Sequence, residues 1–437
     1  MLEGFANASR IPELRRRLLF TAAMLAVYRI GVAVPTPGID GQALADLLSH
    51  ISGTLFGWIN LFSGGGLERF SVFALGIMPY ISVAIILDLL KIGWPYLDEL
   101  YKEGEAGRRK ISQYTRYGTV GLAIVQGGMI AVGLENYGAQ GGAGATPLVY
   151  HPGLGFIVMT VITVTAGTIF VMWIGEQITE RGVGNGISLI IMAGIVARLP
   201  SALGSTAQFV KNGEMSIFVL ILIVAVAILV TGGIVYVETG QRRIPIQYAR
   251  RVVGRRVYGG QSSHLPLKIN TSGVIPPIFA SSILVFPATV AAFVPALKEW
   301  SGYLTPGGLI YNLIYVGLII FFCYFYTAVT FNPVDVADNL KKYGGFIPGI
   351  RPGRYTADYI DRILSRITLG GAIYVSAVCI LPTILIQRFN VPFYFGGTAL
   401  LIVVGVALDT MAQIQTHLIA RNYEGFMRRG RVRRPGG

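Results

Sequence analysis

Ten apolar stretches of membrane-spanning length occupy most of this sequence. Each holds about 17 to 25 residues with few charges, and a bilayer core about 30 Å thick requires about 20 apolar residues per helix. The stretches run approximately over residues 18–34, 71–90, 117–134, 153–174, 186–202, 216–237, 273–294, 309–329, 367–387 and 397–419. Only 13% of the residues are charged, about half the share in an average soluble domain. We therefore predict an all-α integral membrane protein and exclude a soluble globular fold.

The basic residues lie almost entirely on one side of these predicted spans. The sequence has 36 Lys and Arg against 22 Asp and Glu, a net charge of +14. When the segments between spans are assigned alternately to two sides, 29 bases fall on one side and five on the other. By the positive-inside rule both termini are cytoplasmic, which requires an even number of spans. Arg29 lies near one end of the first span, and we expect its side chain to snorkel to the interface.

Two stretches depart from the simple pattern of spans and loops. Residues 51–70 alternate apolar patches with a Ser-Gly-Gly-Gly sequence, too interrupted for a spanning helix and too apolar for an ordinary loop. We predict a re-entrant segment that is buried in protein or lines a wet cavity, because irregular backbone cannot face lipid. The fifth span is short and follows the glycine-rich residues 182–186. Five spans per half predict two inverted halves, residues 1–203 and 204–437, a plan found in transport proteins.

The sequence contains no motif typical of an enzyme active site. A Walker A loop, H-E-x-x-H and G-x-S-x-G are all missing, and we predict no catalytic residue, metal site or cofactor. Cys323 and Cys379 lie far apart in apolar runs and are interpreted as core thiols. Asp409 is the acid nearest the middle of a span, and we expect it to be buried and structural. An ion-coupled secondary transporter that uses Asp409 remains the alternative function, and an intramembrane enzyme is the weakest.

Isoleucines gather beside glycines near the middle of several spans. They include Ile81, Ile85 and Ile86 in the second span, Ile187, Ile190 and Ile191 in the fifth, and Ile402 in the tenth. On composition alone, these are ordinary residues of a membrane helix. The sharper hypothesis is a ring of isoleucines that closes a pore by excluding water. Such a ring makes no specific hydrogen bond, so chemically varied segments could pass through it.

Two loops carry more bases than orientation requires. The loop over residues 238–272 holds Arg242, Arg243, Arg250, Arg251, Arg255, Arg256 and Lys268. The loop over 331–366 holds Lys341, Lys342, Arg351, Arg354, Arg362 and Arg366, and the tail over 420–437 adds further arginines. Paired arginines on loops of this length predict a docking surface for RNA phosphates or acidic protein faces. For the tail, topology and anionic lipid headgroups explain the charges equally well.

Eleven short motifs spread over the chain are typical of one known family. They cover residues 62–66, 69–71, 74–82, 184–188, 241–245, 254–258, 264–268, 273–280, 331–333, 337–340 and 348–353. With these motifs the chain resembles the SecY family, the central subunits of bacterial protein-conducting channels. The resemblance covers essentially the whole sequence, although Glu68 and the glycine-rich residues 138–144 are less typical of the family.

The resemblance implies ten helices in two inverted, pseudo-symmetric halves of five around an hourglass pore, with a re-entrant plug helix at about residues 60–72. It implies a pore ring drawn from Ile81, Ile85, Ile187, Ile191, Ile275, Ile278 and Ile402. It assigns the plug to Ser63, Gly64, Gly65, Gly66, Leu67, Glu68, Arg69, Phe70 and Ser71. The pore would open sideways to lipid between the second and seventh helices. Hydropathy instead puts Ile275 and Ile278 near the entrance of the seventh span, which starts at Gly273.

The resemblance also implies a function and a set of partners. A SecY-like channel moves unfolded secretory polypeptides across the bacterial cytoplasmic membrane and releases hydrophobic segments laterally into it. The implied partners are SecE and SecG, the SecA motor ATPase, the ribosome through rRNA and proteins, signal peptides and nascent chains, anionic lipids, SecDF and YidC. SecA and the ribosome would dock on the bases of the first loop, with Arg255 and Arg256 foremost, and on Arg351 of the second.

Overall fold

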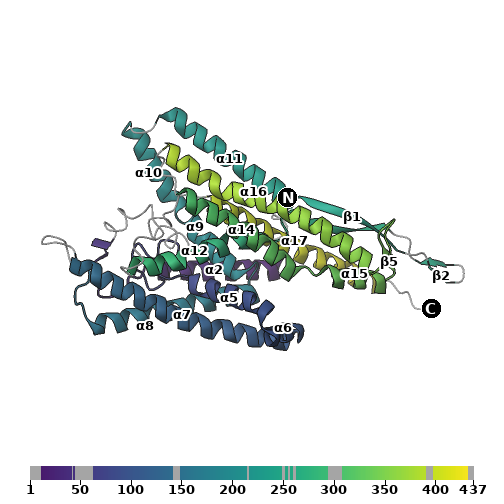
Figure 1. The fold of residues 1–437 in the computed structure, drawn as a ribbon, viewed down its shortest axis with the longest axis horizontal. Coiled ribbons are helices and arrows are strands. Elements are labelled where there is room, and N and C mark those ends of the chain that lie inside the picture. The colour runs from purple at the N-terminus through teal and green to yellow at the C-terminus, as the bar shows by residue number, and fades with distance from the viewer. Residues whose placement is uncertain are drawn as a thin grey trace. The chain divides into compact units, whose positions relative to one another are not determined.

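The fold is mainly helical in a computed structural model that describes residues 11–41, 43–44, 63–140, 148–213, 216–248, 251–253, 256–258, 262–293, 308–389 and 397–431 (Figure 1). Each of the ten predicted spans coincides with a helix or a helix pair. In order these are α2 (Pro12–Ala33), α5 (Met78–Gly93), α7 (Glu105–Gln140), α8 (Leu154–Arg181), α9 (Gly186–Val196) with α10 (Leu199–Lys211), α11 (Ile217–Thr239), α12 (Ile275–Phe293), α14 (Leu309–Thr330), α16 (Arg354–Phe389) and α17 (Gly397–Arg431). Two shorter helices, α6 (Pro95–Lys102) and α15 (Pro333–Lys342), lie between spans.

Among the described residues, seven helical segments are long and apolar enough to cross a membrane on their own. A bent pair, α5 with α6, would make an eighth, with an angle of 100° between its two parts. The other two predicted spans, α2 and α12, are not among these segments. The α2 helix contains a run of three arginines, and α12 is described as apolar only over the shorter stretch Ile275–Leu284. The integral membrane class is confirmed, and the full count of ten stays a prediction.

The chain divides into two compact units. The first unit comprises Met1–Ser205, Ser282–Pro306 and Val406–Gly437, and the second comprises Thr206–Ser281 and Gly307–Gly405. Each unit is therefore built from segments that are far apart in the sequence. The predicted division into residues 1–203 and 204–437, and the inverted symmetry of those halves, stay predictions.

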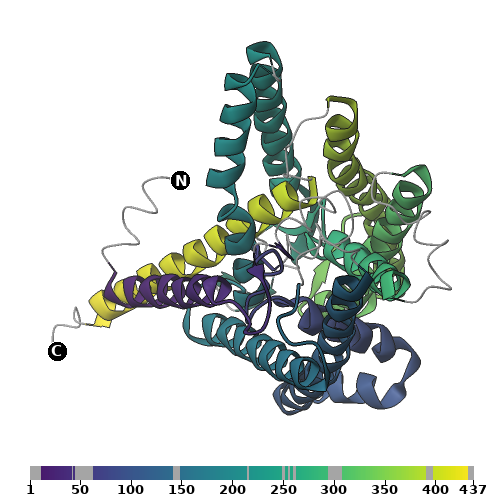
Figure 2. The same ribbon diagram turned by 90° about the vertical axis from the view of Figure 1, so that its left-hand side faces the viewer.

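In the first unit, α7 and α8 pack side by side along much of their length (Figure 2). Small residues allow this close approach, and the α-carbon of Val161 on α8 lies opposite Gly127 on α7. The buried residues Ala123, Ala131 and Val164 form part of one apolar cluster with Phe156. Interhelical packing of this kind, with small residues at the contact, is what holds membrane helices together.

The start of α9 is held by side chains from three directions. The Asn185 side chain accepts hydrogen bonds from the backbone N–H groups of Ile187 and Ser188, which caps the helix. The Val183 N–H donates to the Thr21 hydroxyl of α2, and the Gly184 N–H donates to Gln413 of α17. The glycine-rich residues 182–186 therefore form a junction between helices rather than a flexible linker.

Gly186 lies against the backbone of α8, and this contact leads to a first prediction. A Cβ atom at position 186 would lie 2.0 Å from the carbonyl oxygen of Gly175, so Gly186→Ala must push α8 and α9 apart. We expect a loss of about 1 to 3 kcal/mol in stability, the usual cost of overpacking. Thermal unfolding of the detergent-solubilised protein measures it. The matched control is Gly155→Ala on α8, where no heavy atom lies within 4 Å of the added methyl group.

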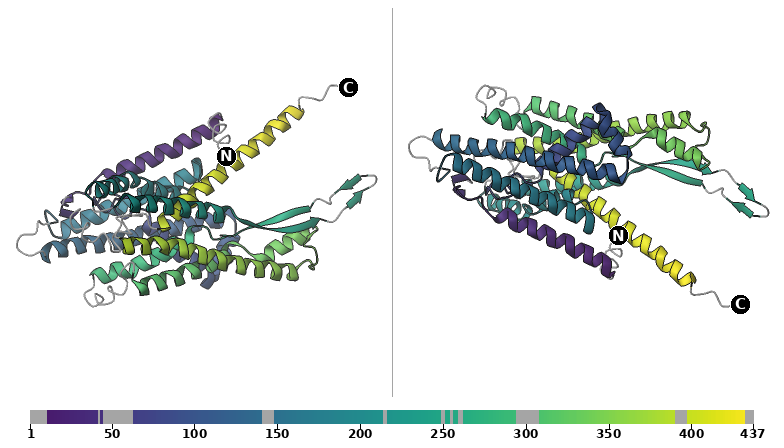
Figure 3. Two further views of the ribbon diagram at one scale, coloured as in Figure 1. Left: turned by 90° about the horizontal axis from the view of Figure 1, so that it is seen from above. Right: turned by 90° about the horizontal axis from the view of Figure 1, so that it is seen from below.

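The second unit adds strands to helices, which the all-α prediction did not include. β1 (Gln241–Tyr248) pairs antiparallel with β4 (Ser262–Lys268) and with β5 (Gly345–Phe346). β2 (Arg251–Val253) and β3 (Arg256–Tyr258) form a hairpin that continues from the β1–β4 pair (Figure 3). The strands form because Ile244 and Ile246 alternate with exposed residues along β1 and bury one side of it. The spans themselves are helical, as predicted.

In the membrane-spanning part of the second unit, α14 packs against α16. Cys323 on α14 and Cys379 on α16 are buried and free, as predicted from their apolar surroundings. Phe279 on α12 packs edge-to-face against Phe322 on α14, with ring centroids 5.7 Å apart. These contacts place the first turns of α12 against α14 within this unit.

Candidate functional site

The segment Ser63–Ser71, which we call the re-entrant segment, is a series of turns. A plug helix was expected over about residues 60–72; residues 60–62 lie outside the described part, and from Ser63 onward that expectation is wrong. Gly64 and Gly65 have φ angles of 66° and 91°, which a right-handed helix does not permit, and Phe70 has a φ of 40°. The Ser63 hydroxyl accepts a hydrogen bond from the Leu67 N–H, so side chains stabilise the turns.

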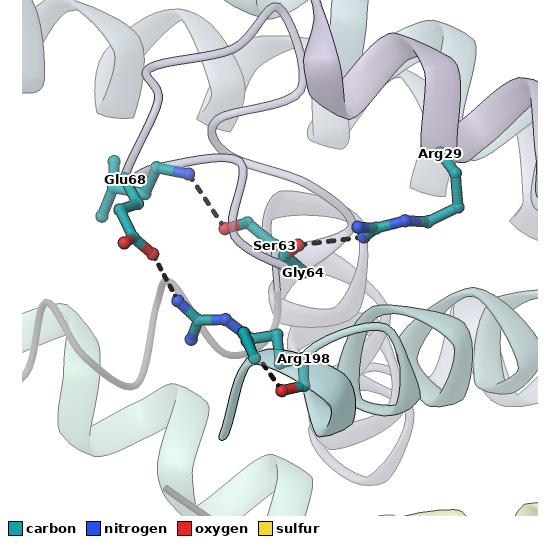
Figure 4. A network of polar contacts seen from close by, with 7 residues as sticks. Arg29, Ser63, Gly64, Glu68 and Arg198 are labelled. Atoms are coloured by element: carbon teal, nitrogen blue, oxygen red, sulfur yellow. Dashed lines mark hydrogen bonds and ion pairs between the residues drawn. The ribbon is translucent and has the colours of Figure 1, made fainter. Parts of the chain in front are cut away.

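Side chains at the end of α2 bind backbone carbonyl groups of the re-entrant segment (Figure 4). The Tyr28 hydroxyl donates to the Ser63 carbonyl at 3.2 Å, and the Arg29 guanidinium donates to the Gly64 carbonyl at 3.0 Å. Arg29 thus has a protein partner near the end of α2, and its predicted position at the membrane interface stays a prediction. A charged donor of this kind makes one of the stronger protein hydrogen bonds.

The end of α9 contacts the same segment from another direction. The backbones of Gly64 and Gly194 approach so closely that a Cβ at Gly64 would lie 2.9 Å from the Gly194 α-carbon. Four residues further along both stretches, the Glu68 carboxylate and the Arg198 guanidinium form an ion pair at 2.6 Å (Figure 4). This ion pair was not predicted from the sequence, because no local spacing connects two positions that are 130 residues apart.

Apolar side chains of the re-entrant segment are buried in the first unit. Leu67 and Phe70 belong to the same cluster as the core residues of α7 and α8. Just after the segment, the Phe73 ring stacks on Tyr28 with centroids 6.0 Å apart and an interplanar angle of 4°. The segment is therefore a docked part of the helical unit, as the prediction of a protein-buried re-entrant stretch required.

The predicted pore isoleucines divide between the two units. Ile81 and Ile85 on α5 and Ile191 on α9 are buried in the first unit, and Ile187 is partly buried there. Spacings of four residues place each pair on one helix face. The second unit contains the other three: Ile275 and Ile278 on α12 are partly buried and buried, respectively, and Ile402 on α17 is buried. Because the two groups belong to separate units, the ring itself stays a prediction.

A polar network holds the chain immediately before α12. The Asn270 amide donates to the Glu238 carboxylate at the end of α11 and to the Gly273 carbonyl. The Ser272 hydroxyl donates to the Asn270 side-chain oxygen, and both residues are buried. This non-helical stretch makes Ile275 the first residue of α12. Hydropathy thus placed the start of the seventh span correctly to within two residues.

The basic loops of the second unit share one small core. Ile244 and Leu267 from the β1–β4 pair, Ile347 from the second loop, and Ile360 and Leu364 from α16 form a buried apolar cluster. Together with the β1–β5 pairing, this cluster joins the loop over 238–272 to the loop over 331–366. Sequence reasoning missed this connection. The alternating isoleucines of residues 241–248 were the available signal for it.

The predicted docking residues lie on the surface of this small fold wherever the structure describes their side chains. Arg242 and Arg243 on β1, Lys268 at the end of β4 and Arg351 are all exposed. The Arg351 carbonyl accepts a hydrogen bond from the Thr356 hydroxyl at the start of α16, which holds its backbone. Arg251 and Arg256 begin the two strands of the β2–β3 hairpin, and Arg250 and Arg255 lie outside the described residues. Arg242, Arg243, Lys268 and Arg351 are therefore all accessible to a partner.

Asp409 does not occupy the buried position that the sequence predicted. Its side chain is exposed on α17, within the apolar window Gly397–Ile419. Span composition alone predicted burial, but burial depends on which neighbours pack against that face of the helix. The Asp88 carboxylate accepts a hydrogen bond from the Tyr101 hydroxyl at 2.8 Å.

Comparison with known proteins agrees with this architecture. The SecY family model matches residues 71–411. The protein translocase subunit SecY of Escherichia coli K12 is 53% identical over 428 residues, which cover 96% of this chain and 95% of the relative. The chain belongs to the SecY family. As a member it is a protein-translocation channel protein that crosses the bacterial inner membrane several times.

Solved structures of the SecY family share the fold. One comes from a study of how the SecY plug domain stabilises the closed state of the translocation channel and maintains a membrane seal; it has a TM-score of 0.63 and 19% sequence identity. Another is Sec61 in the canine ribosome–channel complex from the endoplasmic reticulum, with a TM-score of 0.62 and 16% identity. Each comparison covers 94% of this chain and 96% of the other. At these identities the likeness concerns the fold alone.

Proposed function

We propose that this chain forms the conduit through which unfolded secretory polypeptides cross the cytoplasmic membrane, and from which hydrophobic segments leave laterally. The conduit is closed at rest by a ring of the isoleucines Ile81, Ile85, Ile187, Ile191, Ile275, Ile278 and Ile402. Aliphatic side chains exclude water and ions without binding a passing chain. Hydrophobic segments leave between α5 and α12 because transfer of an apolar helix into lipid is favourable by itself. Both termini lie on the cytoplasmic side.

The re-entrant segment Ser63–Ser71 serves as the plug of this conduit. The single observation that carries this proposal is its docking against the ends of α2 and α9, in the unit that also contains the isoleucines of α5 and α9. Its contacts include hydrogen bonds to the Ser63, Gly64 and Phe70 carbonyls, one ion pair and the apolar side chains Leu67 and Phe70. The polar contacts can be exchanged for water when a polypeptide enters.

The bases of the loops over residues 238–272 and 331–366 form the docking surface for the driving partner. Arg242, Arg243, Arg250, Arg251, Arg255, Arg256, Lys268 and Arg351 would bind the SecA motor or the ribosome, since arginine forks pair with carboxylates and phosphates alike. SecE and SecG accompany the chain, and signal peptides and nascent chains pass through it. SecDF, YidC and anionic lipids complete the set of expected partners. The ribosome-bound Sec61 relative supports the ribosomal role.

Reconstitution tests the proposal directly. The chain, purified with its companion subunits, is placed in vesicles and supplied with an unfolded precursor, SecA and ATP. We expect the precursor to become protected from added protease only when ATP is present. A precursor that stays protease-sensitive, in vesicles that contain folded protein in the correct orientation, would contradict the proposed function. Vesicles without the chain measure the background.

A further inference from the structure

We infer that Glu68 and Arg198 form a latch that holds the re-entrant segment in its docked position and sets how easily it leaves. The inference rests on the proposed role of this segment as the plug, and it adds the regulation of that role. The ion pair joins the segment to the residues between α9 and α10, with 2.6 Å between the nitrogen and the oxygen.

Three hydrogen bonds that hold the segment are of a different kind. Tyr28, Arg29 and the Thr36 N–H bind the carbonyl groups of Ser63, Gly64 and Phe70, which any residue at those positions would offer. The contact with Arg198 depends instead on a side chain of the segment, the Glu68 carboxylate. A substitution at Glu68 or Arg198 therefore changes how strongly the segment is held without changing its backbone contacts.

The exposure of the pair suits a contact that must break and re-form. The Arg198 side chain is 23% exposed and the Glu68 side chain is 48% exposed. A fully buried ion pair is strongly destabilising to break, because a charge is left without water or a partner. Here both charged groups reach water as they separate, so release of the segment needs only a modest free energy.

The latch lies in line with the predicted pore residues. Ile187 and Ile191 precede Gly194 on α9, and Arg198 follows the helix end by two residues. Offsets of four and seven residues return to nearly the same side of an α-helix. The face of α9 that presents the isoleucines thus runs on to Gly194, which touches Gly64, and the turn that follows the helix carries Arg198, which binds Glu68. A polypeptide that pushes this face outward pulls on the latch, which couples widening of the pore to release of the plug.

The backbone at Arg198 is held firmly enough to transmit such a movement. The Arg198 N–H donates to the Ile195 carbonyl, and the Arg198 carbonyl accepts from the Ala202 N–H and the Ser201 hydroxyl. The guanidinium is therefore carried on an ordered turn between α9 and α10. The Ser63 hydroxyl and the Leu67 N–H give the segment a similar internal bond next to Glu68.

Thiol labelling of the segment tests the latch in the full complex. Leu67 is 4% exposed, so a cysteine there reacts with a water-soluble maleimide only when the segment leaves its docked position. The labelling rate then follows the undocked population. Starting from Leu67→Cys, we expect Glu68→Gln and Arg198→Gln each to raise the rate about fivefold, as for loss of a partly exposed ion pair. The chain without Leu67→Cys measures the background from the buried Cys323 and Cys379.

Charge reversal separates the latch from a general loosening of the fold. Glu68→Arg alone and Arg198→Glu alone should label faster than the neutral variants, because like charges then face each other. The double variant Glu68→Arg with Arg198→Glu should label at close to the starting rate. The matched control is Arg116→Gln, which removes the 2.9 Å ion pair with Glu176 between α7 and α8 and should leave the rate unchanged.

Gly64→Ala distinguishes failure of the latch from failure of the plug assignment. Its Cβ meets the Gly194 backbone, and its φ of +66° is strained for alanine, so a segment that undocks at all must undock faster in this variant. Faster labelling in Gly64→Ala with unchanged rates in Glu68→Gln and Arg198→Gln would overturn the latch alone. Unchanged rates in all three variants would overturn the latch and the plug assignment together.

Discussion

Vesicles that contain the variant Ile85→Gly, Ile191→Gly and Ile402→Gly should leak ions at rest. The three side chains are buried on α5, α9 and α17. If they line the constriction, their removal opens a path that water can wet, and the resting conductance should rise on the order of tenfold. Ion flux from loaded vesicles, or single-channel recording in planar bilayers, measures this. The sequence of the re-entrant segment is unchanged in the variant, so the measured leak reports the loss of the three isoleucine side chains.

Each glycine in a helix destabilises the fold by about 1 kcal/mol, and the control variant for this experiment must carry the same loss of stability. Ile124 on α7, Ile162 on α8 and Ile228 on α11 are exposed aliphatic residues, and their triple glycine variant carries the same cost. It should remain sealed. A triple leucine variant at positions 85, 191 and 402 should also remain sealed, because the constriction stays apolar. Unchanged resting conductance in the triple glycine variant at 85, 191 and 402 counts directly against the ring.

Arg351→Glu should abolish SecA-driven translocation while membrane insertion of hydrophobic segments continues. Arg351 is exposed next to the small core that joins the two basic loops, so its side chain is free of any role in packing that core. Reversal of its charge removes a guanidinium donor and places a carboxylate against an acidic partner. A loss of about 2 to 5 kcal/mol in binding, the range for a broken interfacial charge pair, corresponds to at least thirtyfold weaker docking.

ATP-driven protection of a precursor from protease measures the effect of Arg351→Glu. The matched control is Lys341→Glu on α15, an exposed base of the same loop outside the proposed docking set. It should retain most of the transport. Arg351→Lys should give an intermediate rate, since lysine keeps the charge but loses the bidentate geometry of arginine. Normal ATP-driven transport in Arg351→Glu would remove Arg351 from the docking surface.

The sequence predicted the helices of this protein well, because a membrane span is a local property. A run of about 20 apolar residues satisfies its own backbone hydrogen bonds as a helix and needs no distant partner. The start of α12 at Ile275 and the irregular, protein-buried backbone of residues 63–71 follow from such local signals. From Ser63 onward the predicted plug helix is replaced by turns, because the left-handed backbone at Gly64 and Gly65 does not continue a right-handed helix.

Contacts between distant residues were beyond local reasoning. The pairing of β1 with β5 joins residues about 100 positions apart, and it was missed because both loops were interpreted only as carriers of charge. The exposure of Asp409 was predicted wrongly for a related reason, since the polarity of a span does not say which face its neighbours cover.

The sequence by itself thus determined the class of the protein and the approximate positions of its apolar helices, since each depends on the transfer of short segments between water and lipid. Only the tertiary structure decided which residues meet. It placed the Arg29 guanidinium on the Gly64 carbonyl, Glu68 on Arg198, and the two basic loops on one apolar core. These contacts depend on how helices and strands pack, and packing is a property of the whole unit, which no spacing along the chain records.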